Sequence, residues 1–173
     1  MKKIYLIYSD NITPFNTLSD YCQTKFSNVV KIDVDLLAFE NATLSVQNID
    51  FKNPKNKKLK HLTDGLIKVL DKENDNTFKL ICNKIEDIDS DRKLIFLRVN
   101  NLKIITKLKR RFKRKQYITI HIDNYNEITK NEKLMLSEYT FDSIINNLSE
   151  EILNNQIARF VKKKVPSINY IHK

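Results

Sequence analysis

Two runs of basic residues are the features of this sequence best suited to a chemical task. Residues 107–115 read KLKRRFKRK, and residues 162–164 are three consecutive lysines. Clustered ammonium and guanidinium groups bind phosphates without reading base sequence, and each contact adds salt sensitivity. The residues expected to bind phosphate or nucleic acid are Lys107, Lys109, Arg110, Arg111, Lys113, Arg114, Lys115, Lys162, Lys163 and Lys164.

Two questions about this basic surface stay open at the level of sequence. Cations also suit the carboxyl end of a helix dipole, so the same runs could be solvated helix ends. Residues 52–60, which are rich in lysine, could extend the surface, and Tyr117 and Tyr125 could stack on bases. A helix lying on an anionic membrane is the less favoured alternative, because its apolar side is needed to cover a sheet.

A second candidate is the stretch SDNITPFNTL at residues 9–18, which follows an apolar run and opens a helical pattern. A phosphate-binding loop of pattern G-x-x-x-x-G-K-[ST] belongs at such a place. In that register Asp10 and Phe15 replace the glycines, Asn16 replaces the lysine, and only Thr17 fits. Pro14 also lacks a backbone N–H. The stretch therefore predicts a degenerate loop that cannot hold a triphosphate.

Other groups capable of chemistry are scattered along the chain. His61, His121 and His172 lack Cys or acidic neighbours at ligand spacing, so we expect no metal site and no cofactor. Asp33 and Asp35 follow an expected strand, where α/β folds often place functional carboxylates. A role as turn caps is the simpler interpretation of these two residues.

The composition limits the class of protein. The chain has 173 residues, 31 Lys and Arg against 21 Asp and Glu, and a formal charge of +10, which favours polyanionic partners. Gly65 is its single glycine, so a glycine-built nucleotide site is nearly excluded. Cys22 and Cys82 lie among apolar residues and predict buried thiols. The short apolar run near the start is expected to be a strand of a cytoplasmic protein, and we expect no membrane span.

Hydrophobic periodicity predicts the elements that would position these groups. Expected strands cover residues 3–8, 29–34, 93–99, 117–122 and 141–146. Expected helices cover residues 14–26, 36–39, 57–70, 77–88, 102–112 and 150–165, with Thr13, Asn101 and Ser149 as N-caps. Strands that alternate with helices predict one α/β domain over residues 1–173, a three-layer sandwich with a mostly parallel five-stranded sheet.

Three segments resemble the P-loop nucleoside monophosphate kinases, above all the guanylate-kinase-like and phage-type deoxynucleotide kinases. The first is the strand, degenerate loop and helix of residues 3–26. The second is KLIFLRVNNLKIITKLKRRF at residues 93–112, and the third is FDSIINNLSEEILNNQIARFV at residues 141–161. The resemblance covers about half the chain and implies a P-loop-kinase-like fold.

The departures from that family concern its chemistry. Arg98 keeps a guanidinium near the expected site, but residues 123–125 read DNY where the family carries phosphate-lid arginines. We therefore expect a non-catalytic, kinase-like accessory protein, of phage or mobile-element type, that binds nucleic acid or an acidic protein through its basic surface. One alternative is a nucleotide kinase with an atypical site built on Arg98, Thr17 and Asp33. A second alternative is a structural subunit of a larger assembly.

Overall fold

The structure is a computed structural model, and it describes residues 2–44, 61, 64–68, 75–88, 93–123, 136 and 139–165. These residues fall into two compact units, one formed by residues 1–32 with 90–173 and the other by residues 33–89. Each unit is described by itself. The single-domain organisation of residues 1–173 stays a prediction.

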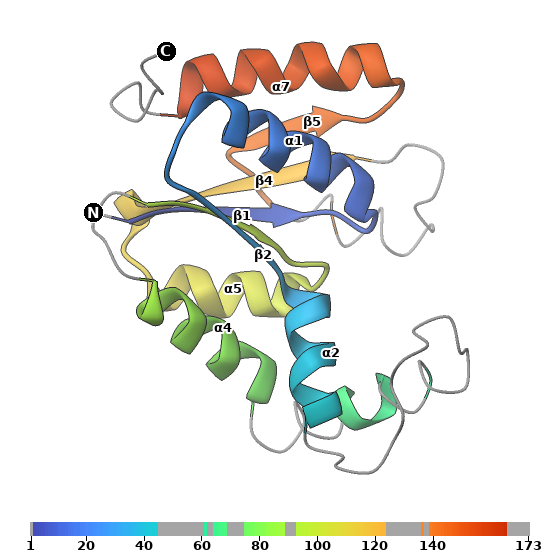
Figure 1. The fold of residues 1–173 in the computed structure, drawn as a ribbon, viewed down its shortest axis with the longest axis vertical. Helices are drawn as coiled ribbons and strands as arrows, with labels where there is room; N and C mark the ends of the chain where they lie inside the picture. Colours follow the sequence, from blue (N-terminus) through green and yellow to red (C-terminus); the bar gives the residue numbers. More distant parts are fainter. Residues whose placement is uncertain are drawn as a thin grey trace. The chain divides into compact units, whose positions relative to one another are not determined.

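The larger unit is built on a five-stranded sheet. Its strands are β1 (Lys3–Tyr8), β2 (Val29–Asp33), β3 (Leu94–Arg98), β4 (Tyr117–Asp123) and β5 (Ser143–Asn146). Their order is β2-β3-β1-β4-β5, with β1 in the centre (Figure 1). All five strands run parallel, where a mostly parallel sheet was expected. Parallel neighbours need long crossovers, and the intervening helices supply them.

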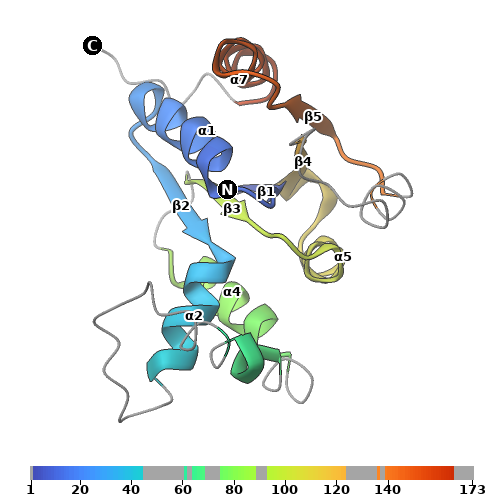
Figure 2. The ribbon, with the colours of Figure 1, turned by 90° about the vertical axis from the view of Figure 1, so that its right-hand side faces the viewer.

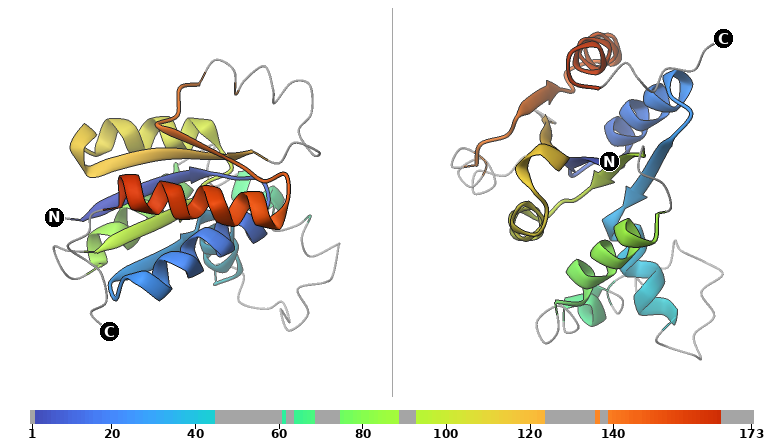
Figure 3. Two further views of the ribbon diagram at one scale, coloured as in Figure 1. Left: turned by 90° about the horizontal axis from the view of Figure 1, so that it is seen from above. Right: turned by 90° about the vertical axis from the view of Figure 1, so that its left-hand side faces the viewer.

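Helices cover both faces of this sheet. Helices α1 (Ile12–Lys25) and α7 (Glu150–Lys164) lie on one face, and α5 (Leu102–Arg111) lies on the other (Figure 2). Seen from above, α1 and α7 lie side by side (Figure 3), and they contact each other. The arrangement confirms the expected α/β three-layer sandwich.

The core lies between the sheet and the layer of α1 and α7. β1 is buried along almost its whole length because it has a paired strand on each side and helices above and below. The rings of Tyr5 and Phe96 stack there with their centroids 4.5 Å apart, and Phe15 and Ile157 pack from the two helices. Cys22 belongs to the same cluster, as its apolar neighbours predict.

Helix α1 begins two residues earlier than expected. Asn11, not Thr13, is the N-cap, and its side chain accepts a hydrogen bond from the Thr13 backbone N–H at 2.9 Å. Pro14 therefore occupies the third helical position rather than the first. Its missing N–H is tolerated there because the first N–H groups of a helix have no partner inside the helix.

Helix α7 is capped by Ser149, as expected, and its hydroxyl accepts a hydrogen bond from the Ile152 N–H at 3.3 Å. Leu153, Ile157, Phe160 and Val161 form its buried stripe. Ile152 is 39% exposed because it lies one position off the face that meets the sheet. Pro166 lies outside the described residues.

The smaller unit contributes two helices that pack against each other, α2 (Val34–Leu44) and α4 (Asn76–Asp87). The α4 prediction was correct to within a residue, and Cys82 is buried on it. Helix α2 is longer than the helix expected at residues 36–39. It begins at Val34, where the Asp33 carboxylate accepts from the Asp35 backbone N–H, and it continues to Leu44. Of the helix expected at residues 57–70, the structure describes residues 61 and 64–68, which are helical.

Candidate polyanion-binding edge and the loop after the first strand

Two hydrogen bonds from β1 hold the two basic runs at the same end of the sheet. The Lys3 ammonium donates to the Lys115 carbonyl oxygen at 2.8 Å, and the Tyr5 hydroxyl donates to the Lys164 carbonyl oxygen at 3.3 Å. Lys3 and Tyr5 are two positions apart, roughly 7 Å along the strand. Segments that lie about fifty residues apart in sequence therefore meet where the strands begin.

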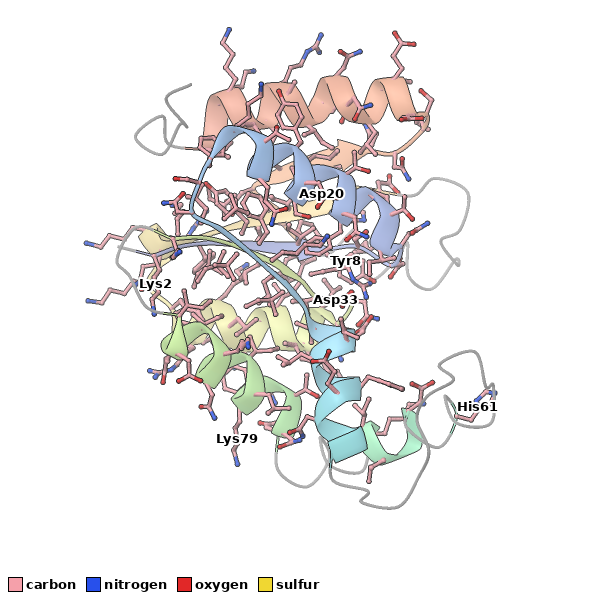
Figure 4. All side chains as sticks on the ribbon, viewed as in Figure 1. Lys2, Tyr8, Asp20, Asp33, His61 and Lys79 are labelled. Carbon is pink, nitrogen blue, oxygen red and sulfur yellow. The ribbon has the colours of Figure 1, made fainter. Side chains whose placement is uncertain are left out.

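The geometry of parallel α/β units explains why cations lie at the end of the sheet where the strands begin. Each helix runs back across the sheet, so its carboxyl end lies where the strands start, and basic residues are favoured at that end of the dipole. The last turns of α5 and α7 carry Lys109, Arg110 and Arg111, and Lys162, Lys163 and Lys164, respectively. In Figure 4, Lys2 marks this end of β1 and Tyr8 the opposite end.

Eight predicted residues are exposed at this end, and we call them the basic edge. They are Arg110, Arg111, Lys113, Arg114, Lys115, Lys162, Lys163 and Lys164. The first two end α5, the next three lie on the turn between α5 and β4, and the last three end α7 (Figure 1). The basic edge thus joins both predicted runs, while residues 52–60 and Tyr125 lie outside the described part of the chain.

Two predicted cations are less exposed than the sequence indicated. Lys107 and Lys109 are half-buried, although they were expected to point outward. The Lys109 ammonium lies 4.6 Å from the centroid of the Tyr139 ring, a cation–π contact. Phe112, the last residue of the helix expected at residues 102–112, is half-buried, because α5 ends at Arg111 and Phe112 is its C-cap.

Arg114 is exposed but already has an acidic partner. Its guanidinium forms an ion pair with Asp142 and donates to the Tyr117 carbonyl oxygen at 3.2 Å. It also lies 5.1 Å from the Tyr117 ring centroid. Tyr117 is 5% exposed, so its ring is a support for Arg114 rather than an open stacking surface.

Asp142 joins the start of β5 to β4. Its carboxylate accepts from the Thr119 backbone N–H at 2.8 Å and from the Thr119 hydroxyl at 2.9 Å. Burial alone would raise the pKa of Asp142, but these hydrogen bonds and the charge of Arg114 outweigh it, and the pKa lies below its ordinary value. The carboxylate therefore stays ionised and holds Arg114 in place.

Lys3 is partly buried at the basic edge. Its pKa is lowered, first by burial and then by the nearby charge of Arg114, against the opposing effect of Asp142. Sequence reasoning missed both Lys3 and Lys93, whose carbonyl oxygen accepts from the Lys3 N–H at 3.0 Å. Their positions in the sequence could have predicted this. Lys3 is the first residue of β1 and Lys93 directly precedes β3, and parallel strands all start at the same end of a sheet.

The loop after β1 lies at the opposite end of the sheet and is short. Residues 9–11 alone connect β1 to α1, so Pro14, Phe15, Asn16 and Thr17 are all helical. The Phe15 side chain is fully buried in the core. The Thr17 hydroxyl donates to the Thr13 carbonyl oxygen at 3.1 Å, a bond within the helix.

Few backbone donors remain at the start of α1 for an anion. The Asn11 side chain takes the Thr13 N–H, and Pro14 has none. Asp10 adds a carboxylate directly before the cap. A helix start binds phosphate through available N–H groups and its dipole, and this one has lost two of its donors and gained a negative charge.

The residual kinase-site candidates have structural contacts. Arg98 is 5% exposed, and its guanidinium donates to the Ser9 carbonyl oxygen at 3.1 Å. Asp33, in the smaller unit, accepts from the Asp35 backbone N–H at 3.0 Å and so caps α2, the simpler of the two roles considered for it. Thr17 is bonded within its own helix. Among the described residues no group of three or more His, Cys, Asp or Glu side chains could hold a metal ion.

A groove of about 530 Å³ lies between the starts of α1 and α7. Its lining residues are Asn11, Thr13, Pro14, Thr17, Asn147, Leu148, Ser149, Glu150 and Leu153. Glu150 is the charged residue of this lining, and both helix starts are occupied by their own caps. The groove therefore offers no basic group to a phosphate and lies away from the basic edge.

Comparisons with known proteins support the fold. No protein-family model matches the chain, and no curated protein does. The crystal structure of TT1252 from Thermus thermophilus is similar, with a TM-score of 0.56, 12% sequence identity, and coverage of 95% of this chain and 98% of that one. At this identity the likeness shows the α/β sandwich alone. In the described residues, no helix combines the length and apolar character needed to cross a membrane.

Proposed function

We propose that this chain is a non-catalytic protein that binds nucleic acid through its basic edge. The observation that carries the proposal is the convergence of two sequence-distant basic runs on one end of the sheet, fixed by the hydrogen bonds of Lys3 and Tyr5. A surface of one charge sign concentrates polyanions and speeds their association. Nucleic acid is favoured over an acidic protein because it carries phosphates at regular, dense spacing.

The absence of catalysis is the second part of the proposal. It is supported by the short loop after β1, the helical placement of Phe15 and Thr17, and the buried contact of Arg98 with Ser9. The resemblance to P-loop kinases would then be one of scaffold, since function resides in the site rather than in the fold.

Charge neutralisation with a matched control tests the proposal. One variant carries Lys162→Gln, Lys163→Gln and Lys164→Gln, and the second carries Arg110→Gln, Lys113→Gln and Lys115→Gln. The control carries Lys79→Gln, Lys84→Gln and Lys103→Gln, which remove three exposed charges from α4 and from the start of α5. Fluorescence anisotropy with labelled DNA then compares proteins of equal net charge.

Each basic-edge variant is expected to lose at least about tenfold in affinity at about 0.1 M salt, with a salt slope shallower by about 3. The control should stay within about twofold of the original protein. Equal losses in all three variants would show a general charge effect and overturn the assignment of the edge. Binding to polyglutamate with no binding to DNA would favour an acidic protein partner instead.

A further inference from the structure

The aromatic rings that the structure describes at the basic edge are not available to bases. Tyr5 is fully buried and Tyr117 is 5% exposed, with the Arg114 guanidinium over its ring. Phe112, the C-cap of α5, is half-buried. Proteins that hold single strands rely on exposed rings, and each stacked base contributes about 1–3 kcal/mol. Within the described residues, the basic edge lacks this element of a single-strand site.

The groove between the starts of α1 and α7 does not serve the basic edge. It lies at the other end of the sheet, and the charged residue of its lining is Glu150. Single-strand sites combine stacking rings with a positively charged groove that follows the backbone. The described cations instead stand on the ends of α5 and α7 and on the turn before β4.

Cations lie on both faces of the sheet. Arg110 and Arg111 end α5, and residues 162–164 end α7, the helix on the opposite face (Figure 2). Packed layers are about 10 Å apart, so roughly 20 Å separates clusters one layer above and one layer below the sheet. Long basic side chains at this spacing can reach phosphates on the two sides of a groove about 12 Å wide.

The described residues of the basic edge contribute charge and no exposed ring, so the affinity that they provide follows the density of phosphate charge. A double helix carries one negative charge per about 1.7 Å of its axis. Each phosphate contact also releases more counterions from a double helix than from a single strand, with salt slopes of about −0.9 and about −0.7 per phosphate, respectively. We infer that the nucleic acid held by the basic edge is a double helix, contacted at its phosphates from both faces of the sheet. This inference rests on the proposed function and specifies which form of nucleic acid the protein binds.

Two consequences follow from contact with phosphates alone. Duplexes of unrelated sequence bind equally, because phosphate contacts position a protein but do not read bases. One phosphate contact from each of the seven exposed cations of the basic edge other than Arg114 gives a salt slope of about −6. These seven are Arg110, Arg111, Lys113, Lys115, Lys162, Lys163 and Lys164.

The test compares a labelled DNA duplex, a second duplex of scrambled sequence, and each isolated strand of the first, by anisotropy between about 50 and 200 mM salt. The expected result is equal affinity for the two duplexes and at least about tenfold weaker binding of each strand. The lysine variant of α7 and the variant of residues 110, 113 and 115 should each lose affinity for the duplex, and the Lys79, Lys84 and Lys103 control should not.

The possible failures are distinct. Strands that bind as tightly as the duplex, or more tightly, would overturn the double-helix inference and leave the proposed function standing. A duplex that loses affinity in only one of the two variants would overturn contact from both faces. Absence of binding to duplex and strands alike, already at about 50 mM salt, would overturn the proposed function itself.

Discussion

The buried guanidinium of Arg98 donates a hydrogen bond to the carbonyl oxygen of Ser9, 3.1 Å away, across the carboxyl ends of β3 and β1. Arg98 lies beside Ile7 in the pairing of these strands, one position before β1 gives way to the loop after Tyr8. The bond ties that loop to the end of β3. The positive charge nearest to residues 9–11 in this pairing is thus bonded to the protein's own backbone.

The first prediction concerns this contact. Arg98→Leu removes a charged hydrogen bond to a buried carbonyl, so we expect the free energy of unfolding to fall by about 1.5–3 kcal/mol in a urea titration. Lys103→Leu, an exposed change on the neighbouring helix, is the control and should have little effect. If Arg98 served a ligand instead, its replacement would leave stability intact and abolish a ligand-dependent signal.

The second prediction addresses nucleotide binding directly. Mg-ATP at about a hundredfold excess over a dissociation constant stabilises a binding protein by about 2.7 kcal/mol. For a chain of this size that corresponds to a rise in Tm of roughly 5–10 °C. We expect no such rise here, because the start of α1 offers too few N–H donors and carries Asp10.

Heparin is the positive control for this measurement. It is a polyanion without a nucleotide, so the basic edge predicts that heparin raises the Tm where Mg-ATP does not. A rise with Mg-ATP that survives neutralisation of Lys162, Lys163 and Lys164 would contradict the non-catalytic interpretation and revive the kinase alternative.

The strands could be located from sequence because their signal is local. Residues 3–8 form β1 as expected, and the other four strands differ from their predicted bounds by at most two residues at either end. The first residue of a helix was harder to predict where two neighbouring residues could each act as the N-cap. Thr13 followed by Pro14 is a favoured pair, yet Asn11 caps the helix. That two-residue difference leaves only residues 9–11 for the loop and places Thr17 well inside α1.

The site was partly visible in the sequence. The basic runs were evident, but their meeting place depends on the sheet order, which puts β1 between β3 and β4. The pairing of Arg114 with Asp142 joins residues 28 positions apart and has no local signature. From sequence alone, every cation in residues 107–115 was expected to bind phosphate. In the structure the side chains of Lys107 and Lys109 are half-buried, whereas the other cations of this run are exposed.

The third prediction concerns a buried histidine at the carboxyl end of β4. His121 is 8% exposed and contacts the rings of Tyr8 and Phe141, at centroid distances of 5.6 and 5.2 Å. Burial lowers its pKa below the ordinary 6.5, and the carboxylates of Asp123 and Asp10 only partly oppose this. As the pH falls through 6.5, His121 of the unfolded chain takes up a proton while His121 of the folded chain stays neutral. The free energy of unfolding therefore falls as the pH drops.

His121→Phe keeps a ring in the same aromatic cluster and removes the titration. Urea midpoints at about pH 7 and about pH 5.5 should therefore differ less for this variant than for the original protein. Identical pH dependence in the two proteins would show that His121 does not contribute to it. Midpoints that rise on acidification would contradict the sign of the shift.

The last prediction separates stability from binding at Asp142. Its folded pKa lies below the ordinary 3.8, so its carboxylate stabilises the protein above that pH, and this contribution is lost as the pH falls through the folded pKa. Asp142→Asn weakens the hydrogen bonds from Thr119 and the ion pair with Arg114. We expect about 1–3 kcal/mol lower stability at neutral pH, and a smaller loss on acidification below about pH 4.

The same change should strengthen nucleic-acid binding. Removing the carboxylate releases Arg114 from its ion pair and raises the net charge of the basic edge by one. Anisotropy with a DNA duplex at a temperature where the variant remains folded should show tighter binding and a salt slope steeper by about 0.9. Asp123→Asn, at the opposite end of the sheet, adds the same charge and is the matched control. Equal gains in the two variants would mean that net charge, and not the basic edge, governs the affinity.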